Sequence, residues 1–191
     1  MYITLDSTGN AMAAPSSEEA RIELVAYASE WPELFAREKA VLELVLKPWL
    51  AAEAEHIGST AVVGMSAKPI IDIMAPVYDL ESSRLAIHAA QALHYCYYPY
   101  KPEQMHWFCK PSPAKRTHHL HLIPWHSRLW LERLAFRDAL RKSATLAGQY
   151  ELLKHELAAR FARDRDTYTE GKSAFISTVL MAQAAAVQST D

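Results

Sequence analysis

A glycine and a serine precede an aspartate that interrupts an apolar run. Gly58-Ser59 follows the segment EHI, and Asp72 lies thirteen residues after Ser59 in the middle of IIDIM. A glycine at the end of a strand lets backbone N–H groups approach a phosphate closely, because it has no Cβ. A carboxylate on the neighbouring strand can hold the magnesium ion that bridges such phosphates. The pattern indicates a phosphate and metal site or, more simply, a turn at Gly58 and a locally paired Asp72.

A second group of candidate ligands lies in the segment THHLHL, residues 117–122. Alternate side chains of a β-strand share a face, so His119 and His121 point to one side and the two leucines to the other. Two imidazoles on one face can bind a metal ion, although solvent-facing histidines are the simpler interpretation. If this strand lies beside the strand of Asp72, the three side chains form a two-histidine, one-carboxylate set.

Basic residues flank both groups and could neutralise a bound anion. Lys68 precedes the Asp72 strand, and Arg116 precedes the histidines. The planar fork of an arginine matches the oxygens of a phosphate. Further along the chain, Tyr168 and Lys172 are one helical turn apart. They either face the sheet or form a tyrosine at the edge of the core with a lysine stem beside it.

Hydrophobic periodicity predicts the elements that position these residues. Helices are expected over residues 31–48, 80–95, 127–142, 143–163 and 167–186, and strands over residues 70–77, 97–100, 105–110 and 117–124. The middle of the chain is therefore rich in strands, and its last third is helical. This order predicts an α+β fold, with a mixed β-sheet flanked by helices and a C-terminal helical segment.

Composition limits the domain count and the class of partner. Residues 1–20 mix small and polar residues without a period and are expected to form a disordered tail, which leaves residues 21–185 as a single domain. The 20 Lys+Arg against 22 Asp+Glu give a net charge of −2, which argues against sequence-specific nucleic-acid binding. No run approaches the roughly 18 apolar residues of a membrane span, and no secretory signal opens the chain. We therefore expect a cytoplasmic protein without a membrane partner; no oligomeric state is predicted.

The sequence also contains, in this order, the strings AYASEWPELFAREKAVL, EHIGSTAVVGMSAKPIIDIM, RTHHLHLIP, LAFRDALR and YTEGKSAFI. Together they resemble the GrpB family, a group of bacterial proteins assigned to the nucleotidyltransferase superfamily of the DNA polymerase β type, and the resemblance runs from about Arg21 to Met181. The resemblance implies a nucleotidyltransferase-like fold. It also implies that Gly58-Ser59 is the phosphate-binding signature and that Asp72 is the first metal-binding acid.

The sequence departs from the superfamily pattern at the expected positions of further acids. Active members carry a second carboxylate two residues beyond the first, where this chain has Met74. A third acid comes from a neighbouring strand, where His119 or His121 stands instead. Because the two-metal mechanism relies on carboxylates, Met74 weakens the inference of catalysis. Gly171 replaces the usual Ala and is expected to loosen the final helix by up to about 1 kcal/mol.

Three functions are expected from this combination. The first is nucleotidyl transfer from a nucleoside triphosphate with a divalent metal, Mg in the first place and Mn or Zn as alternatives. In it Asp72, His119 and His121 hold the metal and serve catalysis, while the nucleotide or another phosphorylated small molecule is bound by Gly58, Ser59, Lys68 and Arg116. The second is a non-catalytic nucleotide- or phosphate-binding module that has lost catalytic carboxylates. The third is a histidine-based metal or phosphate hydrolase, although Thr117 occupies the place of that motif's first histidine.

Overall fold

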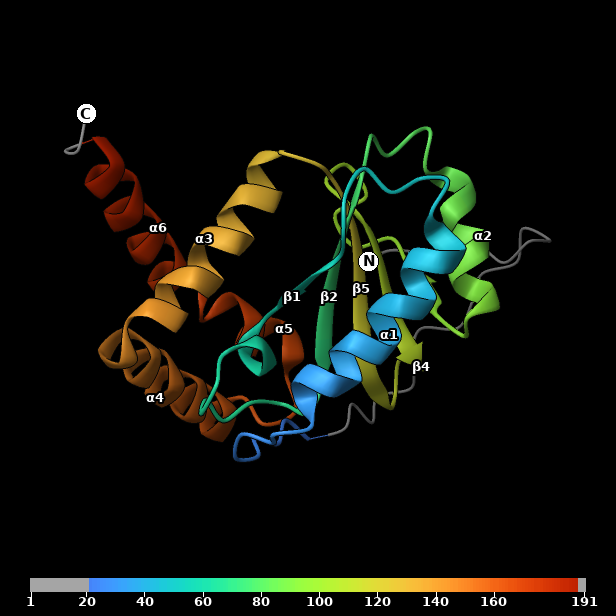
Figure 1. Cartoon of the computed structure of the whole chain (residues 1–191). Helices are drawn as coiled ribbons and strands as arrows, with labels where there is room; N and C mark the ends of the chain where they lie inside the picture. The colour runs from blue at the N-terminus through green and yellow to red at the C-terminus, as the bar shows by residue number, and fades with distance from the viewer. Residues whose placement is uncertain (1–20, 189–191) are drawn as a thin grey trace.

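The computed structural model describes residues 21–188 and has a five-stranded mixed sheet at its centre (Figure 1). The strand order is β1-β2-β5-β4-β3. Strands β2 and β5 are parallel, and the other pairs are antiparallel. The strands are β1 (Glu55–Ile57), β2 (Ile71–Val77), β3 (Cys96–Tyr98), β4 (His106–Pro111) and β5 (Arg116–Pro124). The expected α+β class is confirmed, and the tail predicted for residues 1–20 lies outside the described residues.

One face of the sheet packs against α1 (Trp31–Leu46) and α2 (Arg84–Ala92), which Figure 1 shows on the same side. Helix α1 has Pro32 in its first turn, where a proline is tolerated. Its Leu42 and Leu46 are fully buried against the alternate residues Ile71 and Ile73 of β2. Because alternate residues of β2 point to opposite faces, Ile71 and Ile73 join the main core, whereas Asp72 and Met74 lie on the other face of the sheet.

The C-terminal helices α3 (Arg128–Lys142), α4 (Ala144–Arg160), α5 (Arg165–Glu170) and α6 (Ser173–Gln188) lie on the other side of the sheet (Figure 1). Ser127 and Ser143 cap α3 and α4 by accepting backbone N–H groups of the first turn. Trp130 of α3 packs with Ile57, Met74 and Ile123 of the sheet in a second buried cluster. This cluster joins the helices to the face that carries Asp72.

The last predicted helix, residues 167–186, is wrong in its extent, because the chain forms two helices there. Asp164 caps α5 by accepting the backbone N–H of Thr167 at 2.9 Å, and Gly171 ends it. Gly171 therefore lies in the turn before α6 and does not loosen a continuous helix. A Cβ at this position would overlap the Leu157 side chain of α4, so the glycine allows α5 to pack closely on α4.

Two smaller features complete the frame around the site. The 3₁₀ turn η1 (Ser59–Ala61) follows β1 directly. Strand β2 includes Pro76, as predicted, and the carbonyl of Pro76 accepts the N–H of Ala51 at 2.9 Å. Among the residues that the structure describes, no helix is both long and apolar enough to cross a membrane.

Candidate functional site

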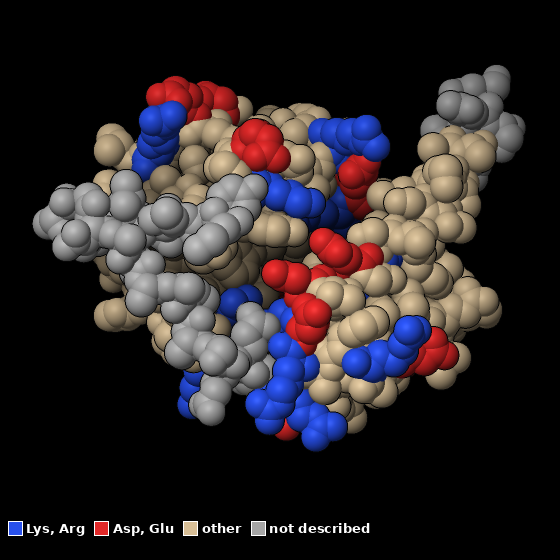
Figure 2. Space-filling model, turned by 180° about the vertical axis from the view of Figure 1, so that it is seen from behind, with Lys and Arg blue, Asp and Glu red and all other residues tan. Residues whose placement is uncertain are grey.

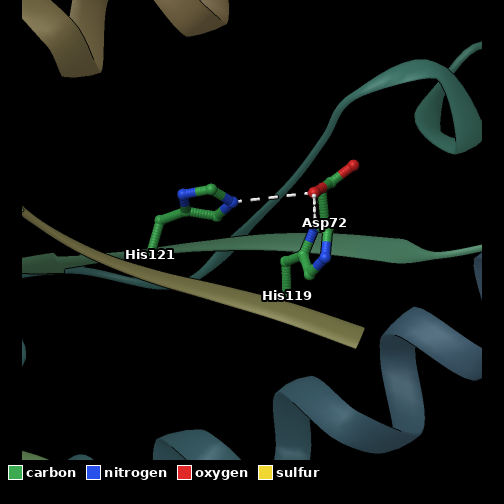
Figure 3. A group of neighbouring side chains, drawn as sticks. All are labelled: Asp72, His119 and His121. Carbon is green, nitrogen blue, oxygen red and sulfur yellow. Dashed lines mark hydrogen bonds and ion pairs between the residues drawn. The ribbon is translucent and has the colours of Figure 1, made fainter. Parts of the chain in front are cut away.

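Asp72, His119 and His121 converge on the sheet face that the C-terminal helices cover (Figure 3). Strands β2 and β5 are neighbours, and Asp72 lies opposite His119 in their register. The Oδ1 atom of Asp72 is 2.9 Å from His119 Nδ1 and 3.6 Å from His121 Nε2. The adjacency on which the sequence argument depended is therefore present, and one ligand atom from each side chain lies within 4.8 Å of the others.

Burial and hydrogen bonding determine the charge of this group. Burial raises the pKa of Asp72, but its interactions with His119 and His121 outweigh burial and hold this pKa well below its usual range. Burial and the nearby Arg133 lower the pKa of His121 to about 3. The site thus combines an ionised carboxylate with a neutral His121 imidazole at pH 7.

Arg133 of α3 fixes the tautomer of His121. Its guanidinium nitrogen NH1 lies 2.8 Å from His121 Nδ1 and can only donate, so Nδ1 accepts. In the neutral ring the proton is then on Nε2, on the side of Asp72. Metal binding through Nε2 requires that this proton leave and that Arg133 give up its hydrogen bond.

Two buried ring nitrogens of this three-residue group have no hydrogen-bond partner among the described residues. They are Nε2 of His119 and Nε2 of His121. In a neutral His119 ring, donation from Nδ1 to Asp72 leaves the lone pair on Nε2. Unsatisfied buried nitrogens are uncommon, and ion binding is one of their ordinary explanations.

The backbone of Gly58 is in close steric contact with the side chain of Asp72. It has φ of 74° and ψ of −175°, which side chains rarely adopt, and a Cβ there would overlap Asp72 Oδ2. The carboxylate therefore lies directly against the Gly58 backbone. The expected phosphate-binding role of Gly58 and Ser59 stays a prediction, because the turn that follows is only three residues long.

The predicted basic residues lie at two different sides of the site. The Arg116 guanidinium lies 5.4 Å from the ring centre of Trp107, and Trp107 is 5.1 Å from the His119 ring. Lys68 lies away from this stack, with its amine 4.8 Å from the Tyr168 ring centre. Tyr168 is buried with Ile22 and Leu157, as in the interpretation that placed it in the core and not against the sheet.

Sequence reasoning missed Arg133 and Lys154. Arg133 lies on a helix twelve residues beyond His121, and no pattern in the sequence connects the two. Lys154 does carry a signal, because it is four residues after Tyr150 and three before Leu157 on the apolar stripe of α4. A lysine at such a position is expected to be buried or functional, and it is 2% exposed.

A cavity of about 590 Å³ lies elsewhere, at the edge strand β1. His56 in its wall stacks on Phe35 with ring centres 4.6 Å apart, and burial lowers the pKa of His56 to about 4. Arg137 there is neutralised by Glu55 at 2.6 Å.

Figure 2 shows, on the face seen from behind, Lys and Arg side chains interspersed with Asp and Glu, without an extended basic surface.

Comparison with known proteins shows the class to which this fold and site belong. The family described as GrpB protein matches residues 21–182, and the chain belongs to that family. The chain is 37% identical over 172 residues to the UPF0157 protein PA4798 of Pseudomonas aeruginosa, covering 86% of this chain and 69% of that protein. It is 33% identical over 158 residues to the UPF0157 protein YqkA of Bacillus subtilis, covering 83% of this chain but only 46% of YqkA.

A solved structure gives the same result for the fold. The crystal structure of the conserved protein GrpB from Enterococcus faecalis matches with a TM-score of 0.75 at 33% identity. The match covers 83% of this chain and 95% of that chain. The sheet and the helices that position Asp72 are thus shared with a GrpB protein.

Proposed function

We propose that the chain is a metal-dependent enzyme that transfers a nucleotidyl group from a nucleoside triphosphate, with a single divalent ion held by Asp72, His119 and His121. The observation that carries the proposal is the convergence of one ligand atom from each side chain within 4.8 Å of the others. Ligands of a four- or six-coordinate ion are about 3.0–3.4 Å apart for metal–ligand bonds near 2.1 Å, so shifts of about 1 Å bring the group into coordination.

The donor set fits such an ion and narrows its identity. Two imidazoles and one carboxylate suit manganese, iron or zinc better than magnesium, which prefers oxygen ligands. The neutral charge of His121 and the unpartnered Nε2 of His119 suit metal binding, which also requires that the His121 proton leave Nε2 and that Arg133 release Nδ1. When bound, the ion would polarise a phosphoryl oxygen of the donor. The expectation therefore moves from Mg toward Mn or Zn.

The protein's own residues supply the surroundings of that chemistry. Helix α3 and the Trp107 ring restrict access of water to the two histidines, whose side chains are 14% and 8% exposed. Arg133 places a positive charge next to His121, where it can neutralise an oxygen of a bound phosphate. The Gly58 backbone keeps Asp72 Oδ2 in place.

Met74 favours a second candidate, the non-catalytic nucleotide-binding module. It occupies the position two residues beyond Asp72 and is fully buried beside Trp130. A thioether there cannot hold a magnesium ion, so the two-carboxylate arrangement of a two-metal site is absent from β2. In this alternative the pocket binds the nucleotide and releases it unchanged.

Calorimetric titration with MnCl₂ and ZnCl₂ tests the metal centre. Asp72→Asn and His119→Gln are expected to weaken the affinity about 100-fold or more, because each removes one of three ligands. His118→Gln is the matched control, since His118 is adjacent on β5 but bonds Thr117 at 2.9 Å on the other face. Equal metal affinity in all four proteins would rule out this centre.

Turnover separates the two candidates. Purified protein with Mn²⁺ and α-labelled nucleoside triphosphates is assayed for transfer of the label to an acceptor hydroxyl, water included, and for release of the pyrophosphate leaving group, beside Asp72→Asn and His118→Gln. Release that is lost only in Asp72→Asn supports transfer. Saturable nucleotide binding without any release supports the binding module instead.

A further inference from the structure

Three lysines from different parts of the chain gather around two tyrosine rings between the sheet and the C-terminal helices. Lys68 comes from the loop before β2, Lys154 from α4, and Lys172 from the turn between α5 and α6. The amines of Lys68 and Lys172 lie 4.8 and 4.5 Å from the ring centre of Tyr168. The amine of Lys154 lies 5.5 Å from the Tyr150 ring centre. We refer to these three residues as the lysine cluster.

The lysine cluster is within electrostatic reach of Asp72. Burial, Lys68 and Lys154 lower the pKa of Lys172 to about 7, whereas the charge of Asp72 raises it. Burial lowers the pKa of Lys154 to about 8. The cluster and the Asp72 site therefore belong to one connected region, since these charges act on one another directly.

Two of these lysines form no close ion pair, although the charges of Glu151 and Asp72 act on Lys154 and Lys172 from farther away. Among the ion pairs formed by the described residues, none includes Lys154 or Lys172. Lys154 is held in place by donating to the carbonyl of Ser66. Tyrosine rings attract cations, but that attraction is small beside the cost of gathering ammonium groups away from water.

We propose that Lys154 and Lys172, with Lys68 beside them, bind the phosphate chain of a triphosphate substrate opposite Asp72. The proposal deepens the function proposed above and rests on it for the identity of the substrate. Three ammonium groups beside two buried tyrosine rings match a polyanion, because the phosphate oxygens supply negative charge close to the amines. The phosphate chain then lies between the lysine cluster on the helices and the metal ligands on the sheet.

Calorimetric titration with inorganic tripolyphosphate in EDTA tests the lysine cluster without any metal. Wild type is expected to bind, and Lys172→Gln to bind roughly tenfold more weakly or worse, because one charge-assisted contact is lost. Lys142→Gln, an exposed lysine in the last turn of α3, is the matched control. Lys172→Arg keeps the charge and should retain most of the affinity, which separates anion binding from damage to the fold.

The outcomes distinguish this proposal from the metal centre. Tripolyphosphate binding that Lys172→Gln weakens and Lys142→Gln leaves unchanged supports the cluster, even if Mn²⁺ fails to bind at Asp72. No binding by wild type, or equal binding by wild type and Lys172→Gln, overturns it, even if the metal binds. The same titrations with ATP test whether its phosphates bind at the cluster. A lower affinity for ATP in Lys172→Gln supports that position, and an unchanged affinity contradicts it.

Discussion

At the scale of single residues, Gly58 is important because its missing side chain leaves room for the carboxylate of Asp72. Gly58→Ala adds a Cβ that overlaps Asp72 Oδ2 in a backbone conformation unsuited to side chains. Gly64→Ala is the matched control, because Gly64 also has positive φ, of 81°, but faces open space. We expect both to lose about 1–3 kcal/mol of unfolding free energy from backbone strain, measured by urea denaturation.

Only Gly58→Ala should also change the site. The displaced carboxylate cannot keep its contact with His119, so affinity for Mn²⁺ is expected to fall in this variant and to persist in Gly64→Ala. Unchanged Mn²⁺ affinity in Gly58→Ala would show that Gly58 serves the turn alone.

The sequence predicted that His119 and His121 share a face and made their convergence with Asp72 conditional on adjacent strands, an adjacency that only the structure supplies. It could not predict the contact between Gly58 and Asp72, which depends on the antiparallel register of β1 with β2. Arg133 was equally out of reach, since its approach to His121 depends on how α3 crosses the sheet. Contacts that depend on the packing of separate elements leave no local pattern.

At the scale of elements, the turn between α5 and α6 carries a lysine whose charge the fold disfavours. The pKa of Lys172 is about 7 in the folded chain against 10.5 for an ordinary lysine. Between these values the unfolded chain binds more protons, so unfolding free energy rises with pH across this window. The penalty is fully present below pH 7 and disappears above about pH 10.5.

Lys172→Gln removes this penalty. The variant is therefore expected to be more stable than wild type at pH 6, with the difference shrinking toward pH 10, in chemical denaturation without phosphate in the buffer. Lys142→Gln should show no such pH-dependent difference. A Lys172→Gln difference that is constant with pH would contradict the lowered pKa.

The elements themselves were largely predictable, with one instructive exception. Apolar periodicity located α1, β2, β5 and α4, because long periodic segments are set by burial. The break between α5 and α6 was missed, since residues 167–186 keep a helical pattern through Gly171 and Lys172. Asp164 caps the start of α5, and at the break Gly171 packs closely on Leu157; periodicity reveals neither contact.

At the scale of the whole molecule, the sheet and the C-terminal helices share a core. Trp130 of α3 is buried with Ile57, Met74 and Ile123 of three strands. Trp130→Ala should cost about 3–5 kcal/mol and lower the melting temperature of the whole protein in a single transition. Differential scanning calorimetry checks this: two separated transitions would show that sheet and helices unfold independently.

Trp107 gives this architecture an optical consequence. Its ring lies 5.1 Å from that of His119 and 6.4 Å from that of His121. An imidazole that gains a proton or a metal ion withdraws electrons from an excited indole more strongly than a neutral one. The fluorescence of Trp107 therefore dims when the histidine pair changes state, and Trp107→Phe supplies the background from the other tryptophans. The occupancy of this face of the sheet can be read as emitted light, with no label attached.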